Sequence, residues 1–182
     1  MKGTNRVLEL ASDLLPELHV DQSISHNGIC LTVTEVRASS YLVTAVDETI
    51  QKTTLGDWQV GDPINVERCM SASGRFDGHI VQGHVDQVGL CEGIQEVGGS
   101  WLFDFSFDPS VGNITVEKGS ICVNGVSLTV FESRTASFRV AIIPYTYAYT
   151  NFRQLRVGDR VNLEFDIVGK YIQRVLKGYA VG

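Results

Sequence analysis

The sequence has no run of lysines or arginines and no apolar stretch near the ~20 residues needed to cross a bilayer. Its formal net charge is −6 and its pI is about 5.1, which disfavours nucleic acid and anionic membranes as partners. Glu9 and Asp13 interrupt the apolar residues that follow Lys2 and Arg6, so a secretory signal is not expected. We predict a soluble, cytoplasmic protein that acts on a small, weakly charged molecule.

The spacings that hold metals and redox-active thiols are also missing. The four histidines show no H-x-H or H-x-x-x-H pattern, and none of the four cysteines belongs to a C-x-x-C pair. We therefore expect no metal site. We expect reduced, mostly buried thiols at Cys30, Cys69, Cys91 and Cys122.

An internal repeat is the most informative feature that is present. The segment N-G-I-C-L-T-V at 27–33 returns as N-G-V-S-L-T-V at 124–130, an offset of 97 residues. The same offset relates Thr49 to Thr146, Gly61-Asp62 to Gly158-Asp159, and N-V-E at 65–67 to N-L-E at 162–164. A constant offset over about forty residues indicates gene duplication, with each copy folding to the same unit.

Each copy has the pattern of short strands. In the first copy, residues 30–36, 41–46 and 64–69 are rich in β-branched residues and are separated by Gly, Asp and Ser. Closure into a barrel removes exposed sheet edges. We predict an all-β fold of two homologous six-stranded Greek-key barrels of the flavin-binding type plus a C-terminal α-helix, with domains at 1–80 and 81–167 and a trimerisation helix and tail at 168–182.

The repeat also decides two local assignments. Residues 6–15 have helical spacing, but their counterpart W-L-F-D-F-S-F at 101–107 alternates in the manner of a strand, so we predict a strand at 6–11. Residues 170–176 have no counterpart in the first copy, and their apolar residues have helical spacing. A terminal helix with an apolar face indicates an oligomer contact.

These motifs resemble those of the riboflavin synthase family, in its alpha type with duplicated lumazine-binding barrels. The most specific is G-H-I-V-Q-G-H-V-D at 78–86, and the resemblance covers nearly the whole chain. It implies conversion of two 6,7-dimethyl-8-ribityllumazine molecules into riboflavin and 5-amino-6-ribitylaminouracil by transfer of a four-carbon unit, with no external cofactor or metal. It also implies a homotrimer with active sites between the N-terminal barrel of one subunit and the C-terminal barrel of the next, and lumazine synthase is a candidate partner.

By this resemblance, four residues are the catalytic candidates. Cys30 and Ser127 are equivalent positions at the pyrimidine and ribityl region, and His84 is a proton carrier near the 7-methyl group. Asp166 replaces Cys69 of the first copy and is suited to accept a ribityl hydroxyl or to steer a proton. The structural alternatives are a small core residue for Cys30 and Ser127, a junction histidine for His84, and a solvated strand-end acid for Asp166. His79 is expected to be a structural histidine.

The resemblance also implies a set of substrate contacts. Thr49 and Thr146 suit a polyhydroxylated chain, although threonine is also a common strand residue. Lys118 is suited to a ribityl hydroxyl or an anionic lumazine, or is simply solvated. Tyr145 stands where the family more often has an acid. The full set is Cys30, Leu31, Thr32, Thr44, Ala45, Val46, Asp47, Glu48, Thr49, Gly83, His84, Val85, Lys118, Ser127, Leu128, Thr129, Ala141, Ile142, Ile143, Pro144, Tyr145 and Thr146.

Two other functions compete with this hypothesis. A non-catalytic lumazine or flavin carrier on the same fold is the main alternative, but carriers tend to lose one pocket and here both N-G-x-x-L-T-V segments persist. A flavin-binding reductase barrel is disfavoured, since no Gly-rich nucleotide motif accompanies it.

The offset makes one further prediction, about the first barrel. Residues 83–97, which open the second barrel, have no counterpart in the first. Family members usually begin with a short strand of the M-F-[ST]-G-I-V type, which is not found in this sequence. A barrel without its opening strand has an unpaired edge and an incomplete pocket. We expect this chain to fold and to bind ligand in its C-terminal barrel, but to catalyse weakly or not at all.

Overall fold

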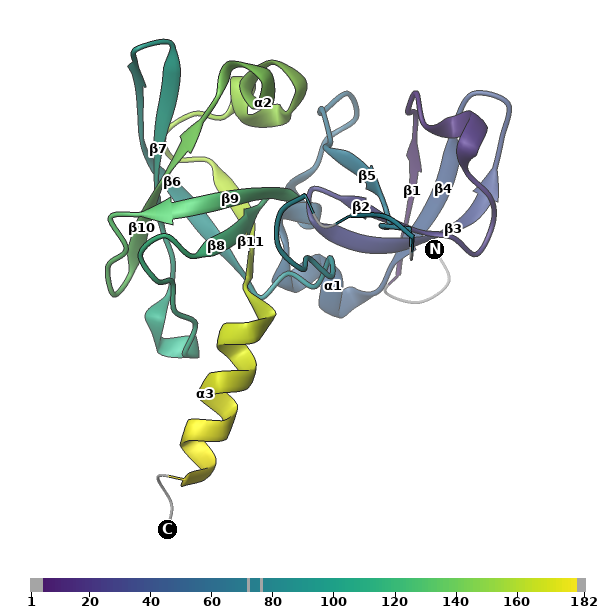
Figure 1. Cartoon of the computed structure of the whole chain (residues 1–182). Coiled ribbons are helices and arrows are strands. Elements are labelled where there is room, and N and C mark those ends of the chain that lie inside the picture. The colour runs from purple at the N-terminus through teal and green to yellow at the C-terminus, as the bar shows by residue number, and fades with distance from the viewer. Residues whose placement is uncertain (1–4, 72, 76, 180–182) are drawn as a thin grey trace.

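Two β units lie side by side, and one helix leads away from the second (Figure 1). The computed structural model describes residues 5–71, 73–75 and 77–179. The first unit contains the strands β1 (Arg6–Leu10), β2 (Ser23–His26), β3 (Ile29–Val36), β4 (Tyr41–Ala45) and β5 (Val66–Arg68), and the helix α1 (Asp47–Lys52). The second contains β6 (Gln87–Val97), β7 (Ser100–Ser106), β8 (Ser120–Val123), β9 (Val126–Phe131), β10 (Ser137–Ile142), β11 (Arg160–Phe165) and the helix α2 (Pro144–Tyr149). Short 3-10 turns occur at Leu15–Glu17, Thr54–Asp57, Pro109–Val111 and Asn151–Gln154.

Strand order shows how the two copies correspond. The second unit is a closed barrel in the order β10-β7-β6-β11-β8-β9, and the first is a five-stranded sheet in the order β1-β4-β3-β2-β5. Shifting by 97 residues maps every barrel strand except β6 onto a strand of the first sheet. The all-β, duplicated prediction is therefore confirmed. The first unit, however, has five strands rather than six, because no described segment takes the place of β6 between β1 and β5.

Strand alternation builds the two cores. Phe103, Phe105 and Phe107 point to the barrel interior and are almost fully buried, as the spacing predicts. Their equivalents lie on β1, which is the strand expected at 6–11. The first core is smaller and gathers around Ile24, Val33, Tyr41, Val43 and Leu55.

The repeated Asn-Gly pair forms a hairpin turn in each unit. Asn27 and Gly28 both have positive φ (48° and 79°), and so do Asn124 and Gly125 (47° and 84°), the geometry of a two-residue type I′ turn. The two turns also touch each other. A Cβ on Gly28 would lie 2.9 Å from the Gly125 nitrogen, and one on Gly125 would lie 2.8 Å from the Gly28 nitrogen. Glycine is therefore required here both by the turn and by the contact between the units.

An asparagine network joins the units in the same pseudo-symmetric way. The side-chain amide of Asn162 donates to the Asn27 carbonyl oxygen, and that of Asn65 donates to the Asn124 carbonyl oxygen, both at 2.9 Å. In return, the Asn162 side-chain oxygen accepts from Thr54 N at 2.8 Å. These bonds satisfy polar groups that packing of the two units removes from water.

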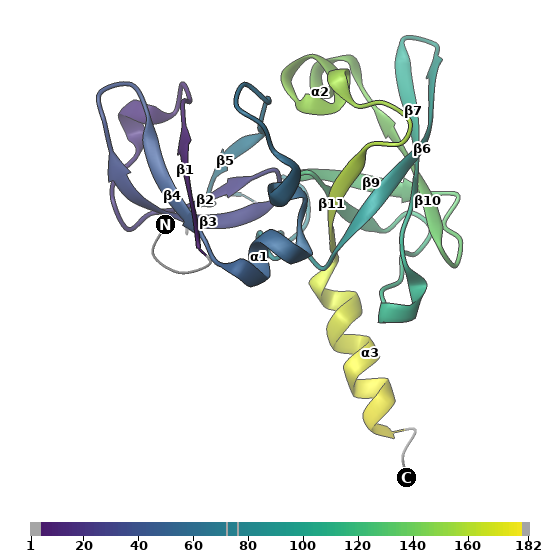
Figure 2. The same ribbon diagram turned by 180° about the vertical axis from the view of Figure 1, so that it is seen from behind.

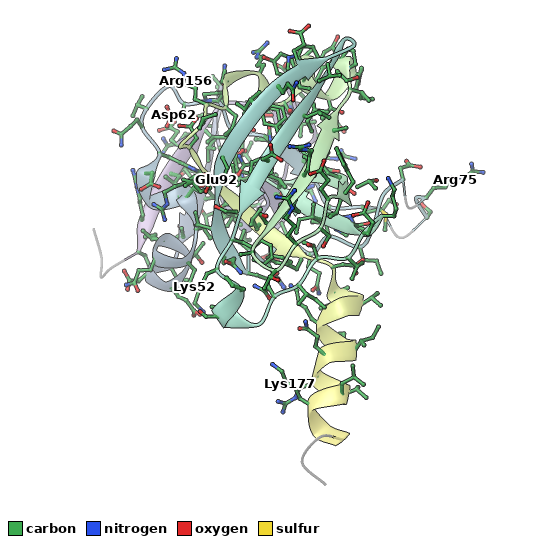
Figure 3. The ribbon with its side chains drawn as sticks, turned by 90° about the vertical axis from the view of Figure 1, so that its left-hand side faces the viewer. Lys52, Asp62, Arg75, Glu92, Arg156 and Lys177 are labelled. Carbon is green, nitrogen blue, oxygen red and sulfur yellow. The ribbon has the colours of Figure 1, made fainter. Side chains whose placement is uncertain are left out.

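The C-terminal helix α3 (Ile167–Tyr179) projects away from both units (Figures 1 and 3). The helix expected at 170–176 is thus confirmed and is longer. Lys170 anchors its first turns through an ion pair with Asp86 at 2.6 Å. Tyr171 and Val175 are 69% and 55% exposed, so the apolar face of α3 is uncovered in the single chain.

Candidate functional site

The outer face of the β3–β4 ladder brings together the predicted residues of the first copy. Along β3, Leu31 and Val33 face the core, so Cys30 and Thr32 lie on the opposite face. Val33 pairs with Val43, and extending this register places Thr32 opposite Thr44 and Cys30 opposite Val46. Cys30 is half-buried at the start of β3, directly after the Asn-Gly turn.

The second copy repeats this arrangement on β9 and β10. Val140 pairs with Val130, which places Thr129 opposite Ala141 and Ser127 opposite Ile143 in the same register. Ser127, Thr129 and Ala141 are all exposed. The two copies thus present equivalent outward-facing side chains. We call Cys30, Thr32, Thr44 and Val46 the first row, and Ser127, Thr129, Ala141 and Ile143 the second row. Each row has a small polar side chain at one end.

Some predicted contact residues face the core instead. The side chains of Leu31, Ala45 and Ile142 are 5%, 0% and 0% exposed and pack inside the units, and Leu128 is packed against the second core. Only their backbone atoms are therefore available to a ligand on the outer face.

The linker between β5 and β6, which joins the two units, approaches the first row. Gly83 is buried, its carbonyl oxygen accepts from Cys30 N at 2.8 Å, and a Cβ on Gly83 would lie 2.7 Å from the Cys30 Cβ. Val85 packs against the first core, whereas the His84 side chain is exposed. The linker thus passes the Cys30 end of the row at Gly83, the residue before His84.

His79 lies at the end of the second row. Its Nδ1 lies 2.7 Å from Ser127 Oγ, and its buried Nε2 has no hydrogen-bond partner among the described residues. Burial lowers the pKa of His79, while the nearby carboxylates of Asp166 and Glu164 act to raise it. His79, Ser127 and the nearby Asp166 therefore place three polar groups at the end of the second row.

Asp166 also has a structural role. Its Oδ1 accepts from Val168 N at 2.9 Å, so Asp166 caps the N-terminus of α3. The cap fixes the carboxylate where the barrel passes into the helix.

The remaining predicted residues lie at the ends of the rows. Val46 and Ile143 precede α1 and α2, so Thr49 and Thr146 lie within short helices. The carboxylates of Asp47 and Glu48 pair with Gln51 and Lys52 on α1, and Pro144 and Tyr145 are exposed at the start of α2.

Lys118 is displaced from Ser127. Its backbone has a φ of +63°, and its ammonium lies 5.8 Å from the centre of the Phe131 ring. Its Asp21 counterpart has a φ of +73°, so both copies use this position as a left-handed turn.

Two hollows in the surface lie away from the predicted site residues. They are found between the units, one around Trp58 and Asn151 and one around Val66 and Tyr149, and no predicted site residue lines either of them. In residues 5–71, 73–75 and 77–179, no group of three His, Cys, Asp or Glu side chains is placed to hold a metal. No helix in the described part of the chain is long and apolar enough to cross a membrane.

Glu164 is a residue that sequence reasoning missed. It is 2% exposed on β11, and its carboxylate accepts from the backbone nitrogens of Gln82, Gly83 and His84 at 2.7, 2.8 and 2.9 Å. The N-x-E repeat at 65–67 and 162–164 was the available signal, but the pattern of letters does not reveal which backbone groups a buried acid holds.

The family model for the lumazine binding domain matches residues 3–69 and 82–166. Similar curated proteins include the riboflavin synthases of Actinobacillus pleuropneumoniae and Bacillus subtilis, 42% and 41% identical, each over 91% of this chain and 77% of the relative. That of Saccharomyces cerevisiae is 36% identical over 95% of this chain and 75% of the relative.

Solved structures give the same fold. LumP complexed with riboflavin is similar at a TM-score of 0.82, with 20% identity over 91% of this chain and 90% of that chain. LumP complexed with 6,7-dimethyl-8-(1'-D-ribityl) lumazine has a TM-score of 0.80, with 19% identity over 90% of this chain and 89% of that one. The match to the family model, the identity to curated riboflavin synthases, the duplicated fold and the repeated outward rows all agree. This chain belongs to the riboflavin synthase family of proteins with paired lumazine-binding domains.

Proposed function

We propose that this chain catalyses the riboflavin synthase reaction, in which two 6,7-dimethyl-8-ribityllumazine molecules give riboflavin and 5-amino-6-ribitylaminouracil. The observation that carries the proposal is the pair of equivalent outward rows, since this reaction uses the same molecule as donor and as acceptor of the four-carbon unit. Holding two reactive heterocycles in a defined orientation supplies much of the rate acceleration in such a reaction.

Each row binds one lumazine. The hydroxyls of Thr32 and Thr44 in the first row, and of Thr129 in the second, are suited to the ribityl chain. We assign the rows to domains 1–80 and 81–167. Both rows are outer faces of sheets, so water is excluded only when two of them meet.

Such a meeting requires another copy of the chain. We place the reaction between the first row of one subunit and the second row of the next, within a homotrimer held partly by the uncovered apolar face of α3. Residues 168–182 are then the trimerisation segment. Lumazine synthase, which would supply the substrate, is a candidate further partner.

The groups at the ends of the rows transfer the protons. His84 and Cys30 serve the first lumazine, and Ser127, hydrogen-bonded to His79 and close to Asp166, serves the second. The difference between Cys30 and Ser127 gives the two ligands different environments, as a donor and an acceptor require. All four cysteines are free thiols, which favours a reducing, cytoplasmic location.

A non-catalytic lumazine or flavin carrier is the second candidate, and the likeness of the fold to the LumP complexes favours it. Incubation with the lumazine, followed by riboflavin fluorescence, separates the two functions. We expect riboflavin from the chain. A carrier would bind the lumazine yet form no riboflavin.

A further inference from the structure

The linker that joins the two units crosses the outer face of the second barrel. The pairing of β8 with β11 and with β9 places Glu164, Cys122 and Ser127 side by side across these three strands. The residues of β11 on either side of Glu164 fill the barrel interior, so this line of side chains is on the outer face. Linker residues 78–79 contact Ser127 at one end of the line, and residues 82–84 contact Glu164 at the other.

Glu164 holds the linker turn at 82–84. Its carboxylate is the only buried one among the described residues, and burial of a carboxylate costs free energy unless hydrogen bonds compensate. Here three consecutive backbone N–H groups donate to it, and consecutive N–H groups that converge in this way form a concave anion site. The anion is a side chain of the protein itself, so the turn has a defined position relative to β11.

The same turn covers Cys30 of the first unit. The Gly83 carbonyl oxygen accepts from Cys30 N at 2.8 Å, and a Cβ on Gly83 would lie 2.7 Å from the Cys30 Cβ. Gly83 also has a φ of +76°, a backbone conformation that favours glycine. Beyond the turn, β6 begins beside the end of β11, near the start of α3 (Figure 2). A carboxylate of the second unit therefore determines how the linker lies on a residue of the first row.

The linker brings a glycine-histidine pair to each row. Gly78 lies on the second row, because a Cβ there would be 2.6 Å from Ser127 Oγ, and the next residue, His79, contacts the same hydroxyl. Five residues later, Gly83 lies on Cys30 and is followed by His84. The polar ends of the two rows are thus both covered by one short segment, which Glu164 fixes at one of its ends.

We propose that Glu164 is a positioning residue for the riboflavin synthase reaction. It acts through the linker, because it keeps Gly83 on Cys30 and thereby fixes the backbone of His84 beside the first row. The inference rests on the proposed function and adds a residue of the second unit to the chemistry of the first row. Displacement of reacting groups by about 1 Å can slow a reaction about a hundredfold. Loss of Glu164 should therefore impair turnover more than ligand binding.

Alkylation of Cys30 by iodoacetamide measures the position of the linker without any turnover. The assay uses a Cys69→Ser background, since Cys69 is exposed whereas Cys91 and Cys122 are buried. Glu164→Gln leaves one acceptor oxygen in place of two, and it should raise the alkylation rate of Cys30 at least about tenfold as the linker opens locally. Glu164→Asp keeps both oxygens on a shorter side chain and should give an intermediate rate.

Two further variants complete the alkylation assay. Gly83→Ala should raise the Cys30 rate with Glu164 intact, because its Cβ would displace the turn from the other side. Glu96→Gln changes an exposed acid on β6 and should leave the rate unchanged. The proposal is overturned if neither Glu164→Gln nor Glu164→Asp changes the alkylation rate.

Kinetics then separate positioning from a purely structural role. In Glu164→Gln, Glu164→Asp and Gly83→Ala, we expect kcat for riboflavin formation to fall roughly tenfold to a hundredfold. The dissociation constant of riboflavin, measured by quenching of its fluorescence, should change less than about threefold. A parallel loss of turnover, riboflavin binding and thermal stability would overturn the proposal. If the wild-type chain forms no riboflavin, the proposed function fails, while the alkylation rates still decide whether Glu164 fixes the linker on Cys30.

Discussion

At the scale of single residues, a buried polar pair distinguishes the first core from the second. His26 is fully buried, and its Nε2 lies 2.8 Å from the Tyr41 hydroxyl. Burial lowers the pKa of His26 to about 4 and raises that of Tyr41 to about 12. The equivalent residues of the second unit are Val123 and Phe138, which do not titrate.

This pair predicts acid sensitivity of the first unit. The pKa of His26 is lower in the folded chain than in the unfolded one. The contribution of neutral His26 to the free energy of unfolding is therefore complete above pH 6.5 and is lost as pH falls toward 4. We expect unfolding free energy to drop by about 2 kcal/mol between pH 7 and pH 5 from this residue. Denaturant unfolding should show the drop in the wild-type chain and in His19→Gln, but not in the double variant His26→Val, Tyr41→Phe.

Substitution of Cys30 and of Cys91 compares a residue of the first row with a residue of the second core. Cys30→Ser should still bind the lumazine but turn over roughly tenfold to a hundredfold more slowly, since it alters a proton-handling group at the end of the first row. Cys91 is fully buried in the second barrel and distant in sequence from either row. Steady-state rates should therefore change little in Cys91→Ser, and an equal loss in both variants would contradict the assignment of Cys30.

One substitution distinguishes the helix-capping role of Asp166 from its proposed role in proton transfer. Asn caps a helix about as well as Asp, so Asp166→Asn should preserve α3 and the thermal stability of the chain. Turnover should still fall by roughly tenfold or more if the carboxylate handles a proton, with less change in the dissociation constant of the lumazine. Unchanged turnover in this variant would leave Asp166 with the cap alone.

At the scale of elements, α3 carries the prediction about assembly. Its apolar residues Tyr171, Ile172 and Val175 lie on one face and are exposed, whereas Lys177 lies on the opposite face. Association of three chains would remove that face from water.

We therefore expect a trimer, three times the 20.0 kDa mass of the chain, in sedimentation at micromolar concentration. Tyr171→Asp with Val175→Asp should give monomers, because the trimer would bury the new charges. Lys177→Asp introduces the same charge on the opposite face of α3 and should leave the trimer intact. A wild-type chain that sediments as a monomer would refute this account of α3.

At the scale of the whole molecule, the repeat predicted most of the architecture. A second copy supplies an independent test of each local pattern, which is why residues 6–11 could be assigned to a strand against their helical spacing. The equivalence of Cys30 and Ser127 also followed from it, whereas the outward direction of the two rows comes from the structure.

Other features could not be predicted, for definite physical reasons. The Asn-Gly turns also form the interface between the units, and a sequence pattern does not show which turn another turn will touch. The helices α1 and α2 are short and follow strands directly, so periodicity gives little signal for them. The pairing of His79 with Ser127, and of Glu164 with the linker, depends on how the chain crosses from one unit to the other.

The stoichiometry of the products tests the central claim most directly. The chain should be incubated with 6,7-dimethyl-8-ribityllumazine, and both products separated and quantified over time. We predict one riboflavin and one 5-amino-6-ribitylaminouracil for every two lumazines consumed. Stable binding of the lumazine with no riboflavin formed would contradict the account.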